Sequence, residues 1–249
     1  MKKKINLHFS VDDVFKSLIE VTDKNIELKK HWFFSNFYKL WKNYKIQTGL
    51  YLFYSGKVDG EIRNLSEIRN IKKELKENWI FFGPHALNTS SPPHKFSPKV
   101  QKQHLSKIYS EISRFAGSKY FVKKVRLHEY SESFELKNFF KKYKVSTLFT
   151  TDKIVGAHRL PRKNKEDLLN YGITKFRNLK FIRTDLRIEM LTKNKKILNQ
   201  KKILNIFTKK KFITIYSHEY ELKRKKCRSI LFETLDFLSK NFDIHLTKP

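Results

Sequence analysis

Residues 5–13 of the chain read Ile-Asn-Leu-His-Phe-Ser-Val-Asp-Asp. The apolar segment Ile5–Phe9 predicts a short buried strand, and the acidic residues Asp12 and Asp13 follow at its carboxyl end. In α/β proteins, binding and catalytic side chains gather where parallel strands end. The other predicted strands of the chain repeat this arrangement of a short apolar segment followed by polar side chains.

Six further apolar segments have the length and composition of strands, and helical patterns separate them. They are Gln47–Tyr54, Trp79–Gly83, Lys124–Leu127, Ser146–Thr150, Lys180–Arg183 and Phe212–Ser217. Strands that alternate with helices pair in parallel, because each crossover helix returns the chain to the same end of the sheet. The predicted fold class is therefore α/β, an irregular (β/α) barrel with about seven parallel strands, in a single domain over residues 1–249.

Local signals position several helices between these strands. A capping box at Asn64 predicts a helix to about Asn78. Ser97, followed by proline, predicts the start of a helix that ends before Gly117. Over residues 164–180 the pattern is weak, and both a loop and an extra helix stay open. Apolar spacing predicts the remaining helices, which are a segment from about Val14, His31–Tyr44, Phe134–Tyr143 and Leu222–Asn241.

The composition excludes several classes of protein. The 249 residues include 54 Lys and Arg against 24 Asp and Glu, a net charge of +30, yet 22 Phe and 11 Tyr supply a core and exclude intrinsic disorder. The single cysteine, Cys227, excludes an intramolecular disulfide framework. The basic residues are mostly lysines spread along the chain without a nucleic-acid-binding motif, so no specific nucleic acid is expected as a partner. The excess charge can instead favour an anionic glycan, a lipid-linked phosphate or peripheral contact with an anionic membrane.

The sequence predicts a cytoplasmic protein. No apolar run approaches the roughly 18–20 residues that a membrane span needs. The first residues resemble the start of a signal peptide, but Asp12 and Asp13 interrupt it before an apolar region forms. The oligomeric state is not indicated by any pattern in the sequence.

Acid, histidine and arginine side chains follow six of the predicted strands. Beyond Asp12 and Asp13 they are His85, Arg126, His128, Glu129, Asp152, Asp185, Arg187, Glu189, His218 and Glu219. At a shared rim such groups would repel one another or stay unpaired, and a bound cation resolves that conflict. One carboxylate with two imidazoles suits zinc or a similar divalent ion and leaves a position for water.

Four short motifs at these strand ends resemble those of the polysaccharide deacetylase family. Phe9–Val14 is similar to the Asp-Asp motif after the family's first strand, and Gly83–Ala86 is similar to its histidine motif. Arg126–Tyr130 falls where the family has an arginine motif, and Ile215–Glu219 falls where it has a late strand followed by histidine. The resemblance spans about residues 5–220 and implies a metal-dependent barrel that removes N- or O-acyl groups from carbohydrates.

The resemblance also implies roles for individual residues. Asp12 is expected to act as general base on the attacking water, while Asp13 and His85 bind the metal. His218 is expected to protonate the departing amine or alkoxide. Arg126 is expected to pair with Asp12 and hold it ionised. The implied cofactor is a divalent metal ion, with zinc as the expected one.

Two positions depart from the family's pattern. The glycine of the usual Asp-Asp-Gly is Val14, and the second histidine of the usual His-x-x-x-His is Thr89. Either His94 or His128 can supply the missing ligand. We prefer His128, because a strand end is held more rigidly than a proline-rich loop.

Asp185, at the end of the sixth predicted strand, is expected to orient Arg126 or His218.

The aromatic residues between His31 and Trp41 could contact a sugar, but their helical spacing favours core packing.

The sequence thus predicts a metal-dependent hydrolase resembling carbohydrate deacetylases, with an acetylated carbohydrate or glycolipid as substrate, in surface polysaccharide or glycolipid assembly. Two alternatives stay open, a catalytically inactive barrel that binds glycans or a partner, and a basic nucleic-acid-binding protein. The sequence indicates neither the sugar nor whether the acyl group is on nitrogen or oxygen.

Overall fold

Parallel pairing around β1 forms the main sheet of the computed structural model, which describes residues 2–151, 159–193, 196–246 and 249. The strand order is β10-β11-β1-β2-β5, and β12 pairs with the first residues of β1. From Leu7 to Asp12 every residue of β1 is buried, as expected for an interior parallel strand. The bounds are β1 (Lys3–Val14), β2 (Thr48–Phe53), β5 (Ile80–Ala86), β10 (Leu186–Arg187), β11 (Phe212–His218) and β12 (Phe242–Leu246).

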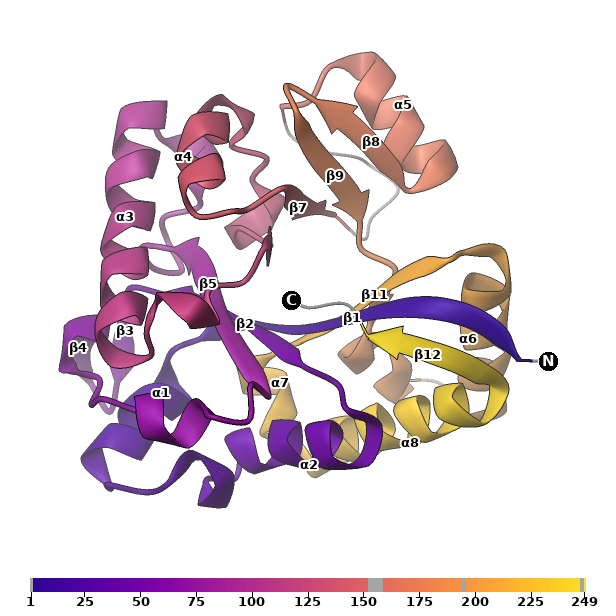
Figure 1. Cartoon of the computed structure of the whole chain (residues 1–249), viewed down its shortest axis with the longest axis horizontal. Helices are drawn as coiled ribbons and strands as arrows, with labels where there is room; N and C mark the ends of the chain where they lie inside the picture. Colours follow the sequence, from indigo (N-terminus) through magenta and orange to yellow (C-terminus); the bar gives the residue numbers. More distant parts are fainter. Residues whose placement is uncertain (1, 152–158, 194–195, 247–248) are drawn as a thin grey trace.

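A second, smaller sheet has the order β6-β7-β9-β8, in which β8 runs antiparallel to β9 and the other pairs are parallel. A parallel bridge between Phe82 and Phe121 links β5 to the segment that leads into β6. The two sheets therefore form two arcs of an irregular barrel. Figure 1 shows the helices on the outside of the strands. The bounds are β6 (Lys124–Val125), β7 (Thr147–Thr150), β8 (Ile173–Phe176) and β9 (Leu179–Arg183).

The longer helices pack an apolar face on the strands. In α3, Pro98 occupies the first turn, the Ser97 hydroxyl accepts from the backbone of Val100, and Leu105 and Ile108 are buried. These contacts follow the predicted cap and apolar spacing. The bounds are α1 (Lys16–Asp23), α2 (Phe34–Tyr44), α3 (Pro98–Phe115), α4 (Lys137–Lys142), α5 (Arg162–Tyr171), α6 (Lys196–Lys209), α7 (Glu219–Leu222) and α8 (Lys225–Asn241).

The predicted α/β class is confirmed, and each of the seven predicted strands overlaps a strand of the structure. They are β1, β2, β5, β6, β7, β9 and β11. Residues 164–180, where a loop or a helix was open, contain most of α5 and then β8. The aromatic segment after His31 forms α2, whose Phe34 and Phe37 are fully buried, so core packing was the correct alternative there.

The predicted helix from Asn64 to Asn78 is wrong. Asn64 does form the capping box, but it caps a single 3₁₀ turn, Leu65–Glu67, and another short turn follows at Lys72–Leu75. The guanidinium of Arg114, on α3, donates to the carbonyl oxygens of Leu65 and Ile68 at 2.7 and 2.8 Å. These long-range bonds take acceptors that a continuing helix would use, so tertiary contacts override the local signal.

A hairpin also stands where no strand was predicted. Strands β3 (Ser55–Val58) and β4 (Glu61–Asn64) pair antiparallel across Asp59-Gly60, where both residues have positive φ. Asp-Gly is a strong sequence signal for such a turn, but the flanking residues are mostly polar and do not have the apolar pattern that predicts strands.

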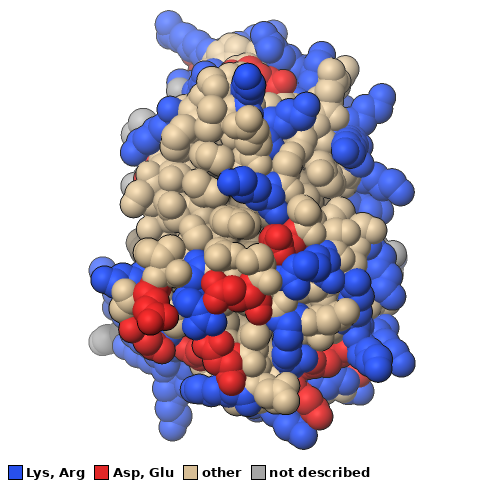
Figure 2. Space-filling view, turned by 90° about the vertical axis from the view of Figure 1, so that its left-hand side faces the viewer, with Lys and Arg blue, Asp and Glu red and all other residues tan. Residues whose placement is uncertain are grey.

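Lys and Arg are dispersed over the molecular face shown in Figure 2, whereas acidic side chains gather in its lower half. The basic excess does not form one compact patch on this face, as the scattered lysines of the sequence predict. Among the described residues, no helix combines the length and apolarity needed to span a membrane.

Gly83, in the strand that leads to His85, has no room for a side chain. A Cβ atom there would lie 2.3 Å from Cγ2 of Val122. Gly83→Ala is therefore expected to lower the free energy of unfolding by about 1–3 kcal/mol, measured by urea denaturation. The double variant with Val122→Ala should be more stable than the sum of the single effects predicts, because the clash is removed. Additive effects, or an unchanged Gly83→Ala, would contradict the packing described.

Candidate metal centre

An irregularity at the end of β1 directs two adjacent aspartates to different places. The register between β1 and β2 shifts between Val11 and Val14, and Asp13 has a φ of 61°. Aspartate tolerates this left-handed conformation better than most residues. As a result Asp12 is buried in the interior of the barrel, whereas Asp13 faces His85 at the rim.

Asp13, His85 and His128 bring one ligand atom each to a common point. His85 Nε2 lies 3.1 Å from Asp13 Oδ1 and 3.3 Å from His128 Nδ1, and His128 Nδ1 lies 3.8 Å from the same carboxylate oxygen. Candidate ligand atoms of the three residues lie within 4.8 Å of one another. The residues come from β1, β5 and the segment after β6, so the parallel sheets assemble the group.

The far nitrogen of each imidazole faces a backbone carbonyl. His85 Nδ1 lies 2.7 Å from the carbonyl oxygen of Arg126, and His128 Nε2 lies 3.0 Å from that of Thr89. When these nitrogens donate to the carbonyls, the lone pairs of His85 Nε2 and His128 Nδ1 point at each other and at Asp13. Such an arrangement requires a shared proton or a metal cation between the three atoms, and a divalent cation satisfies all of them together.

The electrostatics of the group suit metal ligands. Burial alone would raise the pKa of Asp13, but the hydrogen bond with His85 and the charges of the nearby histidines lower it below its usual value. Burial, and then the charge of His85, lowers the pKa of His128. Asp13 is therefore ionised and His128 neutral near pH 7, which are the states that bind a metal.

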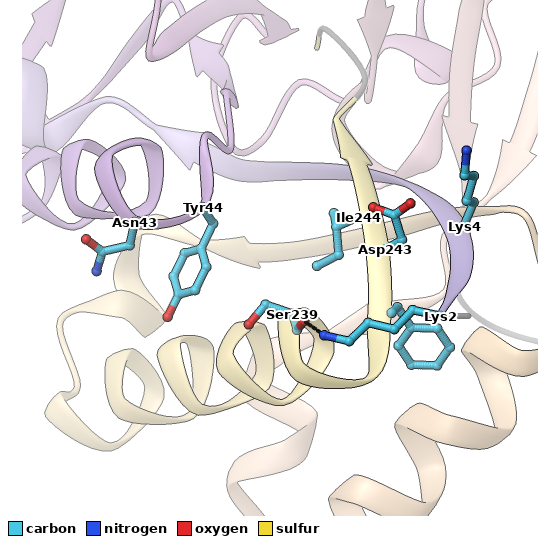
Figure 3. A pocket seen from close by; sticks show the side chains of 8 residues that line it. Lys2, Lys4, Asn43, Tyr44, Ser239, Asp243 and Ile244 are labelled. Atoms are coloured by element: carbon cyan, nitrogen blue, oxygen red, sulfur yellow. Dashed lines mark hydrogen bonds between the residues drawn. The ribbon is translucent and has the colours of Figure 1, made fainter.

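A cavity of about 170 Å³ opens onto these residues. It is lined by Asp12, Asp13, His85, Arg126, Leu127, His128, Glu129, Tyr130, Arg187 and His218. A larger cavity of about 500 Å³ lies at the opposite end of β1, and Figure 3 shows the side chains of Lys4 and Asn43 pointing away from each other there. The smaller cavity is the one that gathers titratable side chains from several strand ends.

Arg126 is buried inside the barrel with a relative exposure of 1%. Its Nη1 donates to Asp12 Oδ1 and to Ser10 Oγ, both at 2.9 Å, and its Nη2 donates to Thr184 Oγ1 at 3.3 Å. The guanidinium also lies 4.2 Å from the ring centre of Tyr216. Asp12 is thus held beside the group of Asp13, His85 and His128 by a buried, hydrogen-bonded cation.

His218, at the end of β11, is paired opposite Asp12 and hydrogen-bonded through Nδ1 to Glu189. Glu189 also accepts a bond of 3.0 Å from the Ser217 hydroxyl. Burial lowers the pKa of His218, but the bond with Glu189 and the negative charges of Asp12, Glu189 and Asp13 outweigh it, so the net pKa is raised. The imidazole is therefore oriented by Glu189 and retains its proton to higher pH.

The structure does not place Asp185 as the sequence suggested. Its carboxylate accepts from the backbone of Thr214 at 3.0 Å and is ion-paired with Lys210, so it ties β9 to β11 instead of orienting Arg126 or His218. Glu189 takes the position beside His218. In the sequence, Glu189 is one of the acidic residues that follow the predicted strands, and no role is predicted for it. Its position in the chain does not indicate that His218 is its partner.

His94, the alternative ligand, lies outside the group of Asp13, His85 and His128. Its Nδ1 lies 3.0 Å from Ser131 Oγ, and its Nε2 lies 3.7 Å from Glu129. The geometry therefore favours His128, the strand-end histidine preferred from the sequence. Asp152, which follows the fifth predicted strand, lies outside the described residues.

Glu219 follows His218 directly and is the first residue of α7. It is buried, and its carboxylate accepts from the backbone N–H groups of Phe15, Lys16 and Ser17, at 3.0, 3.1 and 2.5 Å. These are the free donors at the start of α1, just after Asp13. Glu219 therefore clamps the end of β1 to the end of β11.

No family model matches the sequence, and no curated protein matches it. Solved structures do match. A 4-alpha-glucanotransferase from Thermococcus litoralis has a TM-score of 0.57 and 13% identity over 99% of this chain, which spans only 39% of that protein. A protein from Mycobacterium smegmatis described as a polysaccharide deacetylase has a TM-score of 0.58 and 10% identity, with 98% of this chain and 87% of that one covered.

The Bc1960 peptidoglycan N-acetylglucosamine deacetylase has a TM-score of 0.51 and 11% identity, with 99% of this chain and 87% of that one covered. Likeness at such low identity establishes the fold, and the same fold serves different chemistry in the glucanotransferase. In fold, the chain resembles these two deacetylases and part of the glucanotransferase.

Proposed function

We propose that this chain is a metal-dependent hydrolase that removes an acetyl group from a carbohydrate. The observation that supports the proposal most directly is the convergence of Asp13, His85 and His128 on one point, in a cavity that Asp12 and His218 also line. The similarity in fold to a peptidoglycan N-acetylglucosamine deacetylase supports the substrate class.

A divalent cation would be held by Asp13, His85 and His128, a ligand set that suits zinc. When bound, the cation supplies a Lewis acid that polarises the acyl carbonyl and lowers the pKa of water.

Asp12 acts as the general base. Its carboxylate is next to Asp13 in the chain and is fixed by Arg126, so it takes the proton of the attacking water without reorienting. The Arg126 guanidinium keeps this buried carboxylate in one position.

His218 acts as the general acid. It lines the same cavity and retains its proton because Glu189 and the two aspartates raise its pKa. As the tetrahedral intermediate collapses, the carbon–nitrogen or carbon–oxygen bond breaks and His218 gives its proton to the departing amine or alkoxide. Glu189 stabilises the imidazolium before this transfer.

The substrate in this proposal is an N- or O-acetylated sugar of a surface polysaccharide or glycolipid, handled in the cytoplasm. Because the neighbour of similar fold acts on N-acetylglucosamine, an oligomer of that sugar is the first substrate to test.

Metal content tests the ligand assignment. Asp13→Ala, His85→Ala and His128→Ala are each expected to bind zinc at least about tenfold more weakly than the wild type, because each removes one of three ligands. Equilibrium dialysis followed by elemental analysis measures this. His94→Ala is the matched control, because His94 lies on the same side of the molecule but contacts Ser131 and Glu129.

Unchanged zinc binding in the three ligand variants, or a loss in His94→Ala alone, would contradict the assignment. A wild-type protein that binds no zinc, manganese or cobalt would favour the inactive, glycan- or partner-binding barrel.

The pH profile tests the pairing of His218 with Glu189. Glu189→Gln removes the negative charge that raises the pKa of His218, so the imidazole loses its proton at lower pH. The alkaline limb of kcat/KM for deacetylation is expected to move to lower pH by about one unit. Glu233→Gln, an acid on α8 paired with Ser229, should leave the profile in place. If the alkaline limb of the Glu189→Gln profile lies at the same pH as that of the wild type, His218 is not the general acid.

A further inference from the structure

The cavity at the metal centre is too small to enclose a sugar. Its volume is about 170 Å³, well below the roughly 300–1,000 Å³ of pockets that bury a whole small-molecule ligand. It has room for an acetyl group and a water molecule. The sugar ring that bears the acetyl group must therefore lie at the mouth of the cavity, where surface side chains contact it.

Tyr220 contacts His218, one of the residues that line the cavity. It is in the first turn of α7, which begins directly after β11 and His218. Its ring stacks on the His218 imidazole, with the ring centres 5.2 Å apart and the planes at 29°. The side chain is nevertheless 55% exposed, so the stack on His218 covers only part of the ring.

The charges of the centre also act on the phenol of Tyr220. Partial burial, and after it the negative charges of Asp13 and Glu189, raise the pKa of Tyr220, while Arg187 acts in the opposite direction. Arg187 and Asp13 both line the cavity. The charges of two residues that line the cavity therefore act on the Tyr220 phenol.

Another aromatic side chain, Tyr130, lines the cavity, but it is half-buried, and its hydroxyl accepts a hydrogen bond of 3.0 Å from Arg187 and is paired with the Tyr216 hydroxyl. Phe33, Phe34 and Phe37, in the aromatic segment of the sequence, are fully buried. Among the large side chains that the structure describes as exposed, the other aromatic one is Tyr171, at the end of α5, with 72% exposure. Figure 1 shows α5 apart from α7 and the end of β1.

We propose that Tyr220 is the aromatic platform for the sugar ring whose acetyl group enters the cavity. This inference rests on the proposed function. A pyranose ring has faces rich in C–H groups, which pack on an aromatic ring, and tyrosine offers that surface at low entropic cost. Tyr220 then determines binding of the carbohydrate and leaves the cleavage of the acetyl bond to the groups inside the cavity.

Two substrates distinguish carbohydrate binding by Tyr220 from cleavage of the acetyl bond inside the cavity. An N-acetylglucosamine oligomer carries the ring, whereas a small aryl acetate ester reaches the metal centre without one. In zinc-loaded Tyr220→Ala, KM for the oligomer is expected to rise about tenfold, the effect of losing one aromatic contact. The value of kcat/KM for the aryl acetate should change less than about twofold, a difference of a few tenths of a kcal/mol.

Two variants serve as controls. Tyr220→Phe keeps the ring and should behave like the wild type on both substrates. Tyr171→Ala removes a similarly exposed tyrosine and should also behave like the wild type. A Tyr220→Ala variant that keeps the wild-type KM for the oligomer overturns the proposal, and so does one that loses activity equally on both substrates.

Calorimetric titration of the oligomer into wild type and Tyr220→Ala separates this proposal from the proposed function. If the wild type hydrolyses neither substrate, the hydrolase assignment fails, yet weaker oligomer binding by Tyr220→Ala still supports the platform. Equal binding by the two proteins, or no binding by the wild type, overturns it.

Discussion

The buried pair of Arg126 and Asp12 holds the two halves of the barrel and the candidate site together. Arg126 follows β6 in the smaller sheet, and its guanidinium reaches Ser10 and Asp12 of β1 in the main sheet and Thr184 after β9. Breaking such a pair by removing one partner typically costs about 3–5 kcal/mol, because the other charge stays buried. The same contact fixes the carboxylate proposed as general base, so stability and chemistry depend on one interaction.

Much of the fold could be predicted because burial on both faces makes interior parallel strands continuous apolar segments. The ends of those strands could be predicted too, and with them Asp12, Asp13, His85 and His128. Contacts between residues that are distant in the sequence could not be predicted in this way. The carbonyls of the segment after Asn64 are bound by Arg114 from another helix, and no local pattern reports that.

For the candidate site, the sequence predicts which types of residue follow the strands. It does not predict as well which of these side chains contact each other. Asp185 and Glu189 both follow the sixth predicted strand, and only the fold shows that Glu189 meets His218. Thr89 stands where the resembled family has its second histidine, and its backbone carbonyl lies 3.0 Å from His128 Nε2. The backbone of the residue at that position thus orients His128, the histidine proposed to replace the missing ligand.

Asp13, His85 and His128 are proposed to share one metal ion. A crystal structure of the zinc-loaded protein, with anomalous diffraction recorded above and below the zinc absorption edge, tests it most directly. We expect one strong anomalous peak at about 2.0–2.2 Å from Asp13 Oδ1, His85 Nε2 and His128 Nδ1. A crystal without a peak at this position, or with the zinc bound by His94 and Glu129 instead, would contradict it.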